Sequence, residues 1–242
     1  AFTLGTEGGS GDGAVIWTLS AGDAALVNGE TGDVYVTGVG DFTVTATKLG
    51  GSGFDDVSAS ASFTAGKRQL ILESQPTVVT EKIYDGTTLS QVLDMGQISG
   101  FRPEDEGSVP IQATARFENK DAGMGKTVVV SYSLDSLTEY YEAPQTTYVY
   151  GGAIYPLAVS LAWNYSAPLT YNCGQQQVSA YVSNALDGDS VSCTAYEGAS
   201  GTDAGYYQAY VTALDNPNYT LTGAEGNELL WSISPRTVTV KA

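Results

Sequence analysis

The sequence is built from units that recur at a spacing of about 80 to 90 residues. Three segments that read as opening strands, at 67–71, 155–159 and 234–238, mark the start of successive units. A unit of this length has room for one small β-sandwich, which typically takes about 100 residues. The spacing therefore favours several small domains in series over one large domain.

Shared motifs inside the units support the repeat. The tripeptide Asp-Ala-Gly occurs at 121–123 and again at 203–205, each time just before a strand-like run. Upstream of each copy lies a turn that begins with tyrosine, at 84–86 and at 171–174. The common order of turns and strands indicates a common structural plan.

Alternation of apolar and polar residues identifies the strands. Residues 41–47 and 57–63 alternate with a period of two, and Phe42, Val44 and Ala46 are predicted to face a core. The 29 glycines suit turns, and the 16 tyrosines suit pleated sheets. No segment longer than about ten residues keeps a strong helical periodicity. We predict an all-β fold.

The motifs divide the chain into consecutive segments with short linkers. The predicted modules are 1–65, 66–152 and 153–234, followed at 235–242 by the opening strand of a further module or by a terminal strand. The sequence opens and stops within this pattern. We therefore interpret it as a fragment of a longer chain.

Charge and residue usage disfavour several functions. The net charge of −17 repels nucleic acid and anionic membrane surfaces. The chain has no histidine, which is the commonest general base and the main zinc ligand. No run of about 18 apolar residues is present. We expect neither nucleic-acid binding nor direct membrane contact, and we predict that the chain is not an enzyme.

All three predicted modules resemble domains of bacterial surface proteins. The first module resembles a bacterial immunoglobulin-like domain of group 2, through Trp17 and the segment 37–47. The second resembles the YDG repeat, through the segments 82–88 and 119–123. These motifs are informative about fold and compartment but not about a ligand.

The third module is similar to the related MBG-type module, through the segments 186–191 and 202–205. Together the resemblances imply tandem immunoglobulin-like β-sandwich modules arranged end to end, outside a bacterial cell at its surface or wall. Such modules are typically spacers or display units, and the families offer no catalytic residues to transfer.

A tyrosine corner is predicted in the third module. Residues 203–209 match the Asp-x-Gly-x-Tyr-x-Cys run of immunoglobulin domains, with Ala209 in place of the cysteine. Asp203 and Tyr207 are the candidate residues, and the Tyr207 hydroxyl is expected to bond to nearby backbone.

The only two cysteines, Cys173 and Cys193, both lie in the third module. Outside the cell a disulfide between them is chemically allowed, and we predict this bridge. The alternative is two buried free thiols, and either role is structural.

Aromatic residues of the third module suggest a possible surface for a glycan or an extracellular protein. The alternative is that these rings fill the core and cross-strand pairs. The candidate residues are Trp163, Tyr165, Tyr181, Tyr196 and Tyr210.

No cofactor is expected, although acidic groups at 55–56, 104–106 and 187–189 leave calcium open. Their alternative role is turn formation and solvation. The leading interpretation is a non-catalytic spacer or adhesin-like segment whose partners are adjacent modules of the parent chain. A glycan- or host-protein-binding module is one alternative. An accessory region of a secreted carbohydrate-active enzyme is another.

Overall fold

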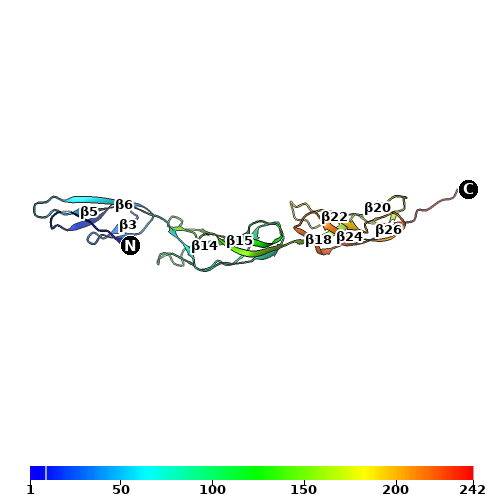
Figure 1. The fold of residues 1–242 in the computed structure, drawn as a ribbon, viewed down its shortest axis with the longest axis horizontal. Coiled ribbons are helices and arrows are strands. Elements are labelled where there is room, and N and C mark those ends of the chain that lie inside the picture. Colours follow the sequence, from blue (N-terminus) through cyan, green and yellow to red (C-terminus); the bar gives the residue numbers. More distant parts are fainter. Residues whose placement is uncertain (9, 242) are drawn as a thin grey trace. The chain divides into compact units, whose positions relative to one another are not determined.

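The computed structural model describes residues 1–8 and 10–241. All of its regular elements are β-strands, so the predicted all-β fold is confirmed (Figure 1). Within this described part, no helix is present that could span a membrane.

The chain forms two compact units, and both draw on the middle of the sequence. Unit 1 comprises 1–75, 96–113 and 131–146. Unit 2 comprises 76–95, 114–130 and 147–242. The predicted boundary after residue 65 falls inside unit 1, and the one after residue 152 falls inside unit 2. The division into three modules stays a prediction.

Unit 1 contains a small β-sandwich near the start of the chain. Its strands are β1 (Phe2–Thr3), β2 (Val15–Ala21), β3 (Ala25–Val27), β4 (Asp33–Val36), β5 (Gly40–Lys48) and β6 (Val57–Ala65). One sheet has the order β2-β5-β6 and the other the order β1-β4-β3. Strands β7 (Arg68–Gln69), β8 (Ile71–Leu72), β13 (Ile98–Ser99) and β16 (Tyr141–Glu142) complete the unit as short pairs.

Alternation in β5 explains both faces of the larger sheet. Phe42, Val44 and Ala46 are buried as predicted, because they face the core that also holds Trp17 and Val34. The intervening threonines point away from this core. Their hydroxyls lie 2.8 to 2.9 Å from serine hydroxyls of β6, in the pairs Thr43–Ser62, Thr45–Ser60 and Thr47–Ser58.

Unit 2 consists of several sheets. Its strands are β9 (Thr77–Val78), β10 (Glu81–Ile83), β11 (Leu89–Ser90), β12 (Val92–Asp94), β17 (Thr147–Tyr155), β18 (Leu157–Trp163), β19 (Leu169–Thr170), β20 (Gln176–Gln177), β21 (Ala180–Val182), β22 (Cys193–Glu197), β23 (Ser200–Gly201), β24 (Gly205–Leu214), β25 (Tyr219–Glu225) and β26 (Glu228–Ser234). Strands β14 (Ile111–Phe117) and β15 (Gly123–Leu134) have residues in both units.

The larger sheets of unit 2 have the orders β10-β17-β15-β14-β11, β19-β26-β24-β22 and β21-β18-β25. Trp231 and Ile233 of β26 are buried with Ala209 of β24. Residues 235–241 lie in no strand, and Ala242, the last residue of the predicted segment 235–242, lies outside the described residues.

Candidate functional site

The candidate site is a cluster around the Asp189 carboxylate in unit 2, here called the Asp189 cluster. The hydroxyls of Tyr84 and Tyr219 donate to its Oδ2 atom at 2.7 and 2.9 Å. The Lys120 ammonium lies 3.6 Å from its Oδ1 atom. Protein donors therefore surround a side chain that is only 11% exposed.

Strand ends and turns position these side chains. Tyr84 follows β10, and its N–H donates to the carbonyl of Tyr155 at 2.8 Å. Asp189 closes a turn by donating its N–H to the carbonyl of Leu186 at 3.0 Å. The Tyr219 hydroxyl accepts the N–H of Leu186 at 2.9 Å, which ties the same turn to the start of β25. Tyr84 and Tyr219 meet edge to face, with ring centroids 5.7 Å apart.

Burial and charge shift the protonation equilibria of the Asp189 cluster. The hydrogen bond from Tyr84 is the main cause that lowers the pKa of Asp189, and the Tyr219 bond and Lys120 act in the same direction. Burial raises the pKa of Tyr84, and the neighbouring Asp189 adds to that increase. The carboxylate thus stays charged and the phenol neutral near pH 7, which preserves the bond between them.

Asn218 extends the cluster to the first Asp-Ala-Gly motif. Its side-chain oxygen accepts the Ala122 N–H at 2.7 Å, and its amide nitrogen lies 3.4 Å from Asp121. Asn218 is 9% exposed. A buried amide that is satisfied on both atoms holds its surroundings in one arrangement.

The arrangement binds residues from the predicted second module, among them Tyr84 and Lys120, to Asp189 and Tyr219 of the predicted third module. Protein groups contact both oxygens of the Asp189 carboxylate, which therefore acts as an acceptor for the protein's own donors. The hydrogen bonds and the ion pair of the cluster therefore link segments that are far apart in the sequence.

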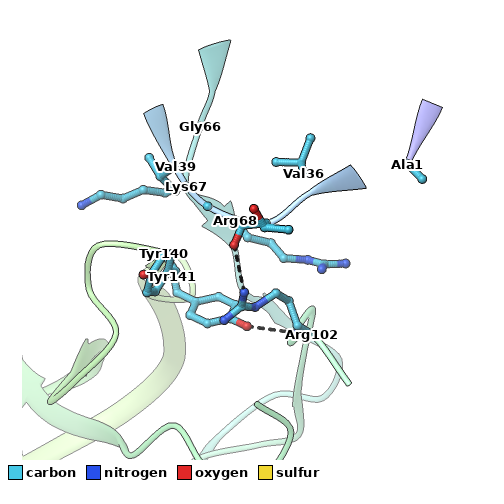
Figure 2. Close-up of a pocket in the computed structure, with 11 residues that line it drawn as sticks. Ala1, Val36, Val39, Gly66, Lys67, Arg68, Arg102, Tyr140 and Tyr141 are labelled. Carbon is cyan, nitrogen blue, oxygen red and sulfur yellow. Dashed lines mark hydrogen bonds between the residues drawn. The ribbon is translucent and has the colours of Figure 1, made fainter. Parts of the chain in front are cut away.

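In a second cluster, Arg102, Tyr140 and Tyr141 line a cavity of about 420 Å³ in unit 1 (Figure 2). The Tyr141 hydroxyl donates to Asp105 at 2.6 Å, and the Arg102 guanidinium donates to the same carboxylate at 2.7 Å. Arg102 also donates to the carbonyl of Thr37 at 3.3 Å and lies over the Tyr140 ring. The bond from Tyr141 is the main cause that lowers the pKa of Asp105, followed by Arg102.

The predicted tyrosine corner has the expected geometry at its hydroxyl. Tyr207 donates to the carbonyl of Asp203 at 2.6 Å. Its ring stacks on buried Trp231, with centroids 4.5 Å apart. Ala209, which replaces the cysteine of the motif, is fully buried in the same core.

The predicted disulfide is absent, which corrects the sequence-based interpretation. Cys173 and Cys193 are free, the first exposed and the second half-buried. Cys173 follows β19, which pairs with β26 at the Gly205 end of β24, whereas Cys193 pairs with Leu214 at its other end. A strand of 10 residues spans roughly 30 Å, and a disulfide needs Cα atoms within about 7 Å.

Of the two roles considered for the aromatic residues of the third module, core packing describes three of the five. Trp163, Tyr165 and Tyr196 pack against the core that contains Trp231. Their polar atoms bond within the protein: Trp163 donates to Gly226, Tyr196 bonds to Ala180, and Tyr165 accepts from the Ser232 N–H. Exposed Tyr181 lies on β21 and half-buried Tyr210 on β24, which are in different sheets. Three of the five rings therefore pack against the core.

In residues 1–8 and 10–241, no group of three or more Cys, Asp or Glu side chains could hold a metal ion. Three acidic segments, 55–56, 104–106 and 187–189, were considered as calcium ligands. In each of them one aspartate accepts a hydrogen bond from the protein. Asp56 accepts the Gly50 N–H at 2.7 Å, and Asp105 and Asp189 accept tyrosine hydroxyls.

Sequence reasoning missed the Asp189 cluster as a unit. Tyr84, Lys120 and Asp189 each lie in a motif that the sequence makes visible, but in three different motifs. The available signal was that the repeats conserve a leading tyrosine in the turn and an Asp-Ala-Gly motif downstream. Nothing in the linear pattern indicates which loop meets which tyrosine.

Comparison with known proteins gives one family match, which covers part of the chain. Residues 66–148 match the family model of the YDG domain. No curated protein matches the chain. Among solved structures, the zebrafish RET cadherin-like domains 1 to 4 are similar at 10% identity, with a TM-score of 0.26. The similarity covers 92% of this chain and 66% of the RET chain, so this chain spans just under two thirds of that neighbour.

Proposed function

We propose that the chain is a non-catalytic structural segment of a large bacterial cell-surface protein. In this proposal three immunoglobulin-like β-sandwich modules follow one another end to end and hold a binding region away from the cell. The partners are adjacent modules of the parent protein, and no cofactor takes part.

The observation that carries the proposal is the Asp189 cluster. Its four side chains come from both sides of the predicted boundary after residue 152, and three of them converge on the carboxylate of the fourth, Asp189. Charge-assisted hydrogen bonds are short and directional, so such a joint resists bending. A segment whose joint is fixed in this way suits a spacer. The match of residues 66–148 to the YDG domain supports the same role.

Small-angle X-ray scattering of the whole chain tests the proposal. We expect Asp189→Ala to broaden the distribution of interatomic distances relative to the native chain, because two tyrosines and Lys120 lose their acceptor. Asp187→Ala is the matched control, since Asp187 lies in the same turn and is exposed. Circular dichroism checks that both variants keep their strands. Identical scattering from folded Asp189→Ala and native chains would refute a rigid joint at this site.

A ligand-binding role is the second candidate, and the cavity in unit 1 favours it. Lys67 and Arg68 are exposed beside Arg102 on its wall, in a chain with only 10 basic residues. Titration against an array of acidic glycans tests this role. Saturable binding that disappears in Arg68→Ala would support it, whereas a pure spacer gives no saturable signal.

A further inference from the structure

The end of β26 repeats the backbone framework that holds Tyr84. Tyr84 follows β10, which lies parallel to β17, and its N–H donates to the carbonyl of Tyr155 at 2.8 Å. Tyr171 follows β19, which lies parallel to β26, and its N–H donates to the carbonyl of Ser234 at 2.9 Å. The two tyrosines therefore occupy equivalent positions.

The neighbouring strands agree with this equivalence. Gly123 pairs with Ile154 next to the first tyrosine, and Gly205 pairs with Ile233 next to the second. These glycines end the two Asp-Ala-Gly motifs. The motifs are thus placed alike with respect to Tyr84 and Tyr171.

The turns after the two tyrosines also match. Asp85 accepts the Thr87 N–H at 2.9 Å, and Asn172 accepts the Gly174 N–H at 2.9 Å. The residue between acceptor and donor has a positive φ in both turns, 75° at Gly86 and 66° at Cys173. Both tyrosines therefore precede the same type of turn, closed by a side-chain acceptor.

A cavity of about 440 Å³ lies at the second tyrosine, and we call it the Tyr171 cavity. Its lining residues are Tyr171, Asp203, Ala204, Pro235, Arg236 and Val238. Their counterparts around the first tyrosine, in the same order, are Tyr84, Asp121, Ala122, Pro156, Leu157 and Val159.

The two places differ in what covers them. At the first, Asp189 and Tyr219 cover Tyr84, which is 2% exposed, and Val159 is 1% exposed. At the second, Tyr171 is only half-buried and Val238 is 83% exposed. Val240, two residues further on, is 90% exposed on a segment that extends beyond β26 (Figure 1). The backbone framework around Tyr171 is therefore present, but its cavity is not lined by groups that correspond to Asp189 and Tyr219.

We propose that the Tyr171 cavity is the docking site for a further β-sandwich module of the kind formed by residues 157–234. The partner presents a turn with a carboxylate, as Asp189 does, to the Tyr171 hydroxyl. Residues 236–240 become its opening strand, as residues 157–161 are in β18, and this buries Val238 and Val240. The inference rests on the proposed function, since it extends the same joint to the next module.

Charge complementarity identifies the partner chemistry. At the first joint Lys120 supplies the positive charge beside Asp189, but its counterpart at the second is Thr202. Arg236 lines the Tyr171 cavity where Leu157 stands in the first joint. A cation is thus available from a different position, which favours an acidic turn as the occupant.

The thiol of Cys173 provides the test. It is exposed now, whereas a Cβ at the equivalent Gly86 would lie 3.5 Å from the Leu186 side chain of the docked turn. The test chain is residues 1–240 followed by a second copy of residues 162–234. It carries Cys193→Ser, and both cysteines of the added copy are replaced by serine.

We expect maleimide to label Cys173 at least tenfold more slowly in the extended chain than in the original chain with Cys193→Ser. Asp189→Ala in the added copy alone should restore fast labelling. An extended chain that is folded by circular dichroism yet labels at the original rate would overturn the proposal. If the added copy does not fold, residues 1–235 followed by residues 157–234 give the copy its own opening strand. This chain carries the same serine replacements and is judged by the same rates.

Gly86→Cys separates this inference from the proposed function. In the chain with Cys173→Ser and Cys193→Ser, a cysteine at position 86 should label slowly, because the Leu186 turn covers it. Fast labelling there would contradict the first joint and with it the proposed function. Slow labelling at position 86 combined with fast labelling of Cys173 in a folded extended chain would overturn the docking site alone.

Discussion

At the scale of single residues, the turn after each leading tyrosine shows what one position demands. Gly86 and Cys173 both adopt a positive φ. Glycine reaches this region freely, whereas any residue with a Cβ is strained there. Cys173 therefore keeps the shape of the turn at a cost in stability that Gly86 does not carry.

Cys173→Gly should raise the free energy of unfolding by about 1 kcal/mol, because it removes this strain and the native chain has no disulfide to lose. Urea unfolding monitored by circular dichroism measures the change. Cys193→Ser serves as a control for loss of a thiol, since Cys193 has no positive φ. A lower midpoint for Cys173→Gly would show that the cysteine side chain stabilises the turn.

At the scale of elements, alternation within a strand predicted which side chains face the core. The contacts between strands and sheets depended on how the strands pair. Phe42, Val44 and Ala46 are buried because period-two alternation is a local property of one strand. The aromatic rings of the third module could not be assigned in this way. Trp163 and Tyr196 belong to strands of different sheets, and only the packing of those sheets brings their rings 6.0 Å apart.

Strand β23 has to pass close to the tyrosine corner, which requires a glycine. A Cβ at Gly201 would lie 2.4 Å from Cζ of Tyr207, whose ring is held by Trp231 and by its bond to Asp203. Gly201→Ala should therefore lower the free energy of unfolding by about 1–3 kcal/mol.

Gly205→Ala is the matched control for Gly201→Ala, because a Cβ at Gly205 would have no atom within 4 Å. Thermal unfolding of both variants makes the comparison. Equal midpoints would mean that the Tyr207 ring moves aside without cost.

At the scale of the whole molecule, several carboxylates are held in their charged form by hydrogen bonds. The pKa values of Asp85, Asp105 and Asp189 are all lowered. A carboxylate whose pKa is lower in the folded than in the unfolded chain stabilises the folded state at pH values above its unfolded pKa, which is about 3.9 for aspartate. The contribution is lost as the pH falls through the folded pKa.

The native chain should therefore lose more stability than Asp189→Asn when the pH is lowered from 7 to about 3. The asparagine variant starts from a lower value, because an amide is a weaker acceptor for Tyr84 and Tyr219, but it has no charge to lose. Urea midpoints at the two pH values give the comparison. Parallel losses in the two chains would show that Asp189 is not coupled to folding through its ionisation.

The sequence by itself determined the all-β class, the core-facing side of β5 and the recurrence of the tyrosine turn and the Asp-Ala-Gly motif. These are properties of neighbouring residues, and backbone geometry translates them directly into strands and turns. Tertiary structure alone decided that Asp189 meets Tyr84, 105 residues away along the chain, and that Cys173 and Cys193 lie at opposite ends of β24. Those outcomes depend on which strands pair and how sheets pack, because long-range contacts are set by the burial of whole faces and leave no local pattern.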